Sequence, residues 1–208
     1  MNGDSGRDRI LRAALACFGR DGAAATTLTA LRKEAGVSVG SFYHHFQSKE
    51  EVVAALFAEA LRGYQDEIVQ ELDRHPDPGE AVPAVVARHV GWCVRNPELA
   101  RFLLTERRPV GDEPGMAVLT EQNRRFFGAV RSWWRIQEHH GALRPLDFTL
   151  AFVLWLGPAQ ELCRLWVTGA APEPSAEQVA LLGDAARRSL CPTPDEAPRS
   201  ERPGPAER

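Results

Sequence analysis

The sequence has little of the chemistry that marks secreted, redox-active or metal-dependent proteins. Only four of its 208 residues are cysteines, Cys17, Cys93, Cys163 and Cys191, and none of them forms a C-x-x-C pair. This spacing predicts neither a zinc site nor a redox motif, and we expect separate thiols in a reducing compartment. We therefore expect no metal and no cofactor.

Long apolar runs and alternating patterns are also scarce. The most apolar segment, residues 148–159, has about a dozen residues where a membrane-spanning helix needs roughly 20. The polar start, MNGDSGRDR, lacks the apolar core of a signal peptide. No stretch alternates with period two for the length of a strand. These features predict an all-α protein of the cytoplasm that does not enter a membrane.

What the sequence does contain is apolar residues at helical spacing, in segments separated by proline or glycine. Helices are expected near residues 5–19, 29–35, 39–45, 48–74, 80–95, 97–106, 115–139, 146–169 and 175–190. Gly157-Pro158 should kink the helix 146–169 without ending it. From residue 192 onward, five prolines in 17 residues and few large apolar side chains predict a disordered tail.

Residues 27–51 predict two short helices around one tight turn. The first should open at Thr29, whose side chain can cap it, and end at Gly36, where glycine adopts positive φ at little cost. Ser38 should cap a second helix, residues 39–45. A capping box, Ser48-x-x-Glu51, should start the next helix, whose apolar stripe is long enough to join two domains. Paired helices of this kind form the helix-turn-helix, whose second helix enters a DNA major groove.

The motifs in this stretch resemble those of the TetR family of bacterial transcriptional regulators. They are Thr27, the run AGVS at residues 35–38, the run GSFYHHF at residues 40–46 and SKE at residues 48–50. The resemblance implies a three-helix DNA-binding domain at residues 5–50 and a helical ligand-binding and dimerisation domain at 51–190, followed by the tail 191–208. One position departs from the family: Arg32 stands where a small residue is usual, so its side chain should leave the helix-helix contact or extend out of it.

The resemblance also implies which residues contact DNA. The predicted phosphate contacts are Thr27, Thr29, Tyr43 and Lys49, with Lys49 beside the free N–H groups of a helix start. The predicted base contacts are Val39, Gly40, Ser41 and His44. Ser38, which begins their helix, also belongs to the predicted DNA-binding residues. The charge distribution agrees, because residues 1–50 carry seven basic and five acidic side chains, a net of +2 that leaves −5 for the remainder of a chain of net charge −3.

A two-fold homodimer is expected from the apolar surface of the last two helices. A dimer would place two recognition helices on the half-sites of a palindromic DNA operator, about 34 Å apart. The predicted interface residues are Leu150, Val153, Leu154, Leu162, Leu165, Trp166, Val179, Leu182, Ala186 and Leu190.

Aromatic residues with polar neighbours in residues 80–139 indicate a pocket for a small apolar effector. The candidate ligand-binding residues are Trp92, Trp133 and Trp134, each of which could equally be ordinary core. The expected function is a transcriptional regulator of the repressor type, released from DNA by that effector.

An alternative of a different class stays open, a helical ligand-storage protein or enzyme in which the helix-turn-helix is only structural. His89 lies four residues before Cys93, so the two share a helical face and could form a thiol–imidazole nucleophile. No oxyanion motif and no Asn or Asp partner accompanies them, so we expect a core histidine beside a core cysteine, no catalytic residue and no enzyme.

Overall fold

The computed structural model describes residues 5–106 and 114–193, and within these ranges it contains nine α-helices and no strand. The predicted all-α class is therefore confirmed. The helices are α1 (Gly6–Asp21), α2 (Leu28–Ala35), α3 (Val39–His45), α4 (Lys49–Arg74), α5 (Pro78–Arg95), α6 (Pro97–Thr105), α7 (Pro114–His139), α8 (Phe148–Val167) and α9 (Ala176–Leu190). The predicted disordered tail lies largely outside the described residues.

The helix ends follow the predicted capping signals, with two corrections. Gly36 ends α2 at φ 62°, and the Ser38 side chain accepts a hydrogen bond from the Ser41 amide to begin α3. Thr27, not Thr29, caps α2, because its hydroxyl accepts from the Ala30 amide. Ser48 caps α4 through the Glu51 amide, but the Glu51 carboxylate accepts from the amide of Gln47 instead of Ser48, so the predicted box is only half formed.

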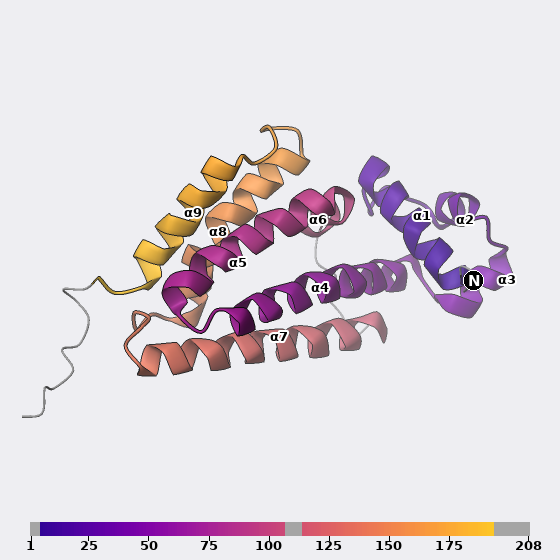
Figure 1. The fold of residues 1–208 in the computed structure, drawn as a ribbon. Coiled ribbons are helices and arrows are strands. Elements are labelled where there is room, and N and C mark those ends of the chain that lie inside the picture. The colour runs from indigo at the N-terminus through magenta and orange to yellow at the C-terminus, as the bar shows by residue number, and fades with distance from the viewer. Residues whose placement is uncertain (1–4, 107–113, 194–208) are drawn as a thin grey trace, which may run out of the picture.

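Helices α1, α2 and α3 form one end of the molecule, and α4 runs from them through the remainder of the bundle (Figure 1). Their core packs buried residues of α1, such as Ile10 and Phe18, against Leu31 and Phe42 and the first turns of α4. Phe102 of α6 and Leu119 of α7 belong to the same core. Helices α1 to α3 therefore share a core with α6 and α7, and this core extends beyond residue 50 of α4.

The second core holds the C-terminal helices together. Helix α7 packs along α4, while α5 is covered by α8 and α9 (Figure 1). Gly183 permits the close approach of α9 to α5, because a Cβ there would lie 3.0 Å from the Pro83 Cβ and 3.2 Å from its Cα. Helix α8 is continuous through Pro158, as predicted.

Candidate nucleic-acid interface and effector cavity

Helix α3 presents an exposed face whose side chains have no role in the core. Val39 is 49% exposed and Tyr43 is 44% exposed, and His44 is exposed beside them. Phe42 on the opposite face is fully buried and contacts Phe46. Aromatic residues thus anchor the helix on one side. On the other side it exposes apolar, hydroxyl and imidazole groups to solvent, as a recognition helix requires.

The remaining residues of the predicted DNA contact are also accessible to solvent, fully or in part. Thr27, Thr29, Ser38 and Gly40 are exposed, and Ser41 is half-buried. Gly6, at the start of α1, lies so close to α3 that a Cβ would come within 2.6 Å of the His45 Nε2 atom. The close approach lets α1 fix the position of α3.

Arg32 is half-buried, and its Nε atom is enclosed with no hydrogen-bond acceptor among the described residues. The departure from the small residue usual in the family is therefore accommodated within α2, but with a buried polar atom that a small residue would not have.

Lys49 is not the exposed ammonium that a phosphate clamp requires. Its Nζ atom donates to the carbonyl oxygens of Ala23 (2.8 Å), Thr26 (3.0 Å) and Ala24 (3.3 Å), and so uses its three donors on the loop between α1 and α2. The predicted position at the start of α4 is correct, but the side chain turns toward the protein. This geometry gives Lys49 a positioning role for the loop that precedes α2.

The same loop is held from the C-terminal domain. A carboxylate oxygen of Glu106, at the end of α6, accepts the Ala23 amide at 3.1 Å. Phe102, one turn earlier in α6, stacks on Phe18 of α1 with ring centroids 5.9 Å apart and contacts Phe57 of α4 at 4.5 Å. Helix α6, with the Glu106 that follows it, therefore contacts α1, α4 and the loop after α1 directly.

A cavity of about 290 Å³ lies between α4, α5, α6, α7 and α8. Its wall is mostly apolar and includes Trp92, Leu104, Phe127 and Phe152, with amide groups from Gln65, Asn123 and Gln160. An apolar wall with a few oriented polar groups is typical of a small-molecule site. Glu106 also lines the cavity, so the residue that holds the Ala23 amide borders the cavity.

The three tryptophans predicted to bind the ligand separate into two groups. Trp92 lines the cavity, whereas Trp133 and Trp134 pack against Trp155, with ring centroids 5.7 and 6.0 Å away. Neither lines the cavity, so their assignment as ligand contacts is corrected to core packing. Helical spacing could not reveal this, because adjacent indoles can point either into a cavity or against a neighbouring helix.

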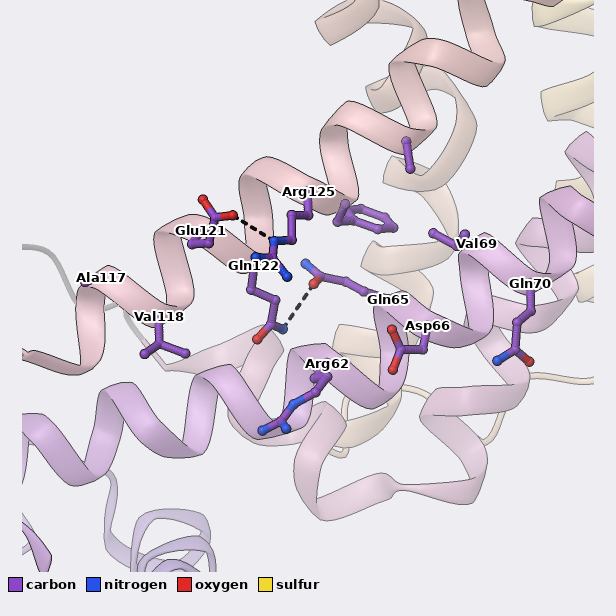
Figure 2. Close-up of a pocket in the computed structure, with 12 residues that line it drawn as sticks. Arg62, Gln65, Asp66, Val69, Gln70, Ala117, Val118, Glu121, Gln122 and Arg125 are labelled. Atoms are coloured by element: carbon purple, nitrogen blue, oxygen red, sulfur yellow. Dashed lines mark hydrogen bonds and ion pairs between the residues drawn. The ribbon is translucent and has the colours of Figure 1, made fainter.

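An amide relay separates the cavity from an outer groove between α4 and α7. Figure 2 shows Gln122 pointing to Gln65, and its Nε2 donates to the Gln65 Oε1 atom at 3.1 Å. The Gln65 Nε2 in turn donates to the Asn123 Oδ1 at 2.8 Å. Gln65 and Phe126 line both spaces, and the groove has a volume of about 940 Å³. Gln65 and Phe126 therefore form the partition between the two spaces.

Glu121 and Arg125 line the groove, and Arg124 pairs with Glu121 beside it. Hydrogen bonds from Arg124 and Arg125 lower the pKa of Glu121 to about 2, so this exposed carboxylate remains ionised (Figure 2).

Helices α8 and α9 expose aliphatic side chains that a partner could cover. Leu150 is 50% exposed, Val153 55% and Leu181 62%, with Leu154 beside them. The other predicted interface residues Leu162, Leu165, Trp166, Val179 and Leu182 are half-buried. Ala186 and Leu190 are buried in the protomer's own core, so they support α9 from within and cannot face a partner. Leu181 was absent from the prediction, although it lies next to Leu182.

These features define a helical DNA-binding protein in which a capped reading helix is joined by α4 and α6 to a domain with an internal cavity. A family model described as "Bacterial regulatory proteins, tetR family" matches residues 10–56. The match supports a TetR family transcriptional regulator, and it covers most of α1, all of α2 and α3 and the start of α4.

Individual proteins resemble the chain in two ways, in sequence over a short segment and in fold over most of its length. The chain is 44% identical over 63 residues to the HTH-type transcriptional repressor KstR2 of Mycobacterium tuberculosis, in an alignment that covers 30% of each chain. The chain thus spans about a third of the length of the curated repressor it matches. A TetR family transcription regulator from Marinobacter aquaeolei VT8 shares the fold with a TM-score of 0.72 at 22% identity, covering 90% of this chain and 96% of that one.

A further solved structure of the same fold is the transcriptional regulator FadR from Bacillus subtilis in complex with stearoyl-CoA. It aligns with a TM-score of 0.69 at 19% identity and covers 86% of this chain and 95% of that one. Among the described helices, none has the combined length and apolar character needed to cross a membrane.

Proposed function

We propose that the protein is a transcriptional repressor that binds a palindromic operator as a homodimer and is released by a small apolar molecule. The observation that carries the proposal is the exposed face of α3, where Val39, Tyr43 and His44 stand in solvent while Phe42 and Phe46 hold the helix from behind. Together the exposed side chains offer a methyl group, a phenol and an imidazole to base edges and phosphates. The 63-residue match to a transcriptional repressor supports repression rather than activation of transcription.

Dimerisation is supported by the exposed aliphatic face of α8 and α9. One recognition helix reads too few base pairs for useful specificity, and a two-fold dimer presents two. Helices α8 and α9 lie on the side of the bundle away from α7, with α4 leading to the reading heads (Figure 1). Pairing two such faces would produce a four-helix interface without covering α3.

Release of DNA by an effector is supported by the contacts that lead from the cavity to helices α1, α2 and α3. A ligand lowers operator affinity only if it binds a form of the dimer that fits DNA poorly. Leu103, Leu104 and Glu106 line the cavity from α6, and Phe102 and Glu106 contact the α1 region. A ligand that displaces α6 would therefore move the loop at Ala23 and, with it, α2 and α3.

The effector class is inferred from the cavity wall. At about 290 Å³ the cavity alone suits a small apolar molecule, and opening of the Gln65 partition into the groove would admit a longer chain. Because a protein of the same fold is described in complex with stearoyl-CoA, fatty acyl compounds of graded chain length are the first probes to test.

The test of the proposal is selection of random-sequence duplexes by the full chain. Selection of an inverted repeat, bound with two chains per duplex, would support the proposal. Selection of no sequence, with salt-sensitive binding that is equal on all duplexes, would favour the storage or enzyme alternative. Addition of the acyl probes to the selected duplex then tests effector release separately.

A further inference from the structure

A cluster of two thiols and one imidazole lies in the C-terminal core, apart from the reading head and from the exposed face of α8 and α9. His89 and Cys93 are one turn apart on α5, and Cys163 reaches them from α8. All three are buried, with exposures of 3%, 2% and 0%. One ligand atom from each lies within 4.8 Å of the other two. We name these three residues the Cys₂His cluster.

The imidazole of His89 has one satisfied and one unsatisfied nitrogen. Nδ1 lies 3.0 Å from the hydroxyl of Tyr64, while Nε2 is enclosed and has no hydrogen-bond partner among the described residues. The Tyr64 hydroxyl can accept a hydrogen bond from Nδ1–H, and this tautomer leaves Nε2 unprotonated. Nε2 then presents its lone pair inside the core. A buried polar atom without a partner costs free energy, and a ligand for it would remove that cost.

The two thiols complete a donor set for a thiophilic cation. Thiolate sulfur and neutral imidazole nitrogen are the ligands of zinc in proteins, and hard cations such as Mg²⁺ prefer oxygen. Tyr64 on Nδ1 occupies the place of the outer hydrogen-bond partner that normally orients a ligating histidine. We propose that the Cys₂His cluster is a binding site for Zn²⁺.

Charge and space agree with this assignment. Zn²⁺ with two thiolates and a neutral imidazole has no net charge, which suits an apolar core, whereas a monovalent cation would leave a buried negative charge. Zinc bonds of about 2.0–2.3 Å require donor atoms roughly 3.3–3.8 Å apart, so donor atoms that now lie within 4.8 Å of one another need to close by at most about 1.5 Å. His89 and Cys93 line the cavity, which leaves room for water or an effector group as the fourth ligand.

The fold brings these three residues together, although their positions in the sequence do not predict that they are neighbours. His89 and Cys93 alone are an i, i+4 pair, and Cys163 lies 70 residues further along the sequence. The expectation of no metal site rested on that separation. The proposal does not depend on DNA binding or on effector release, so its test uses the protein alone.

The test is metal titration of the reduced, metal-free full chain. Cd²⁺ is added first, because thiolate ligation gives an ultraviolet charge-transfer band, and Zn²⁺ is then measured in competition with a chromophoric chelator. We expect one equivalent of either metal per chain. Cys163→Ser and Cys93→Ser should each weaken binding by more than about 100-fold, since each removes a direct ligand, and Tyr64→Phe should weaken it by about 10–100-fold through loss of the outer hydrogen bond.

Two controls keep the result interpretable. Cys191→Ser, which removes a partly buried thiol outside the cluster, should leave the affinity unchanged. Circular dichroism of every variant should match that of the parent chain, and a cluster variant that fails to fold is replaced by His89→Gln. Zinc binding that survives both Cys93→Ser and Cys163→Ser would overturn the proposal. So would the absence of binding by the reduced chain, or a Cys93–Cys163 disulfide that persists in reductant.

Discussion

Lys49 and Glu106 hold the same residue, Ala23, from opposite sides. The ammonium of Lys49 donates to the Ala23 carbonyl at 2.8 Å, and the carboxylate of Glu106 accepts the Ala23 amide at 3.1 Å. Lys49 is the first residue of α4, and Glu106 directly follows α6 and lines the cavity. The loop before α2 is therefore held by one residue next to the helix-turn-helix and by one residue next to the cavity. The position of this loop therefore depends on both α4 and α6.

Replacement of Lys49 with methionine separates a positioning role from a phosphate contact. The variant loses hydrogen bonds from a charged donor, and we expect a loss of about 2 kcal/mol in the free energy of unfolding, with weaker binding to all duplexes. Because no phosphate contact is removed, the slope of log affinity against log salt should stay the same. A slope that falls by about one unit would instead assign Lys49 to a phosphate.

Glu106 offers a matched pair of variants. Glu106→Gln keeps an oxygen that can accept the Ala23 amide, so operator affinity should change little. Glu106→Ala leaves that amide without its partner, and we expect looser coupling between effector binding and DNA release. The measurement is the ratio of operator affinities with and without a saturating effector. Equal ratios for both variants would place the transmission path elsewhere.

The sequence was sufficient for the local structure and insufficient for the long-range contacts. Gly36 and Ser38 fix the turn of the helix-turn-helix by their own backbone and side-chain chemistry, so α2 and α3 were correctly predicted. The inward turn of Lys49 depends on three carbonyls of an irregular loop, which leave no periodic signal. The same limit explains Trp133 and Trp134, whose direction depends on Trp155 from another helix.

Substitutions on the exposed face of α3 should change specificity, not only affinity. Ser41→Ala and His44→Ala remove hydrogen-bonding groups predicted to face base edges, and each should cost about 1–3 kcal/mol of discrimination at one base pair in each half-site. Tyr43→Phe, at a predicted phosphate contact, should weaken binding evenly across sequences. Repeating the duplex selection with each variant checks both expectations. An unchanged consensus for Ser41→Ala and His44→Ala would remove these residues from the base contacts.

A charge on the exposed face of α9 should break the homodimer. Leu181 is 62% exposed, and in the proposed interface a glutamate there would be buried without a partner. Leu181→Glu should give a monomer by sedimentation at micromolar concentration and abolish operator binding while helical content is retained. Val118→Glu is the matched control, because Val118 is 59% exposed on α7. Dissociation by both variants, or by neither, would argue against the α8–α9 interface.

The carboxylate of Glu71 should make the fold sensitive to acid. Burial acts to raise its pKa, but hydrogen bonds and the charge of Arg88, 2.7 Å away, with contributions from His75 and Arg74, lower the pKa overall. A lowered pKa in the folded state means that the unfolded chain binds the proton more readily. The stabilisation is therefore present above the unfolded pKa, near 4.3, and is lost as pH falls through the lower folded value.

Unfolding by denaturant between pH 7 and pH 3 measures this contribution. Glu71→Gln should lower the stability at pH 7 by about 1–3 kcal/mol and flatten its decrease toward low pH. Glu161→Gln is the control, since Glu161 pairs with Arg164 on the surface of α8 and should change neither value measurably. Parallel pH curves for the parent chain and Glu71→Gln would show that other carboxylates govern the acid response.

Filling the cavity from its own wall should prevent effector binding and so prevent release of the operator. Leu104 lines the cavity from α6 and is only partly buried, so Leu104→Trp can place an indole in the space of about 290 Å³ with less strain than a substitution at a fully enclosed position. The variant should bind the operator like the parent chain and fail to release it when acyl probes are added, because the differential binding that drives release is lost. Thr105→Trp is the control, since the exposed Thr105 is the next residue of the same helix and does not line the cavity. Binding of the probe, measured by calorimetric titration, should disappear in Leu104→Trp and persist in Thr105→Trp, and normal release by Leu104→Trp would place the effector outside this cavity.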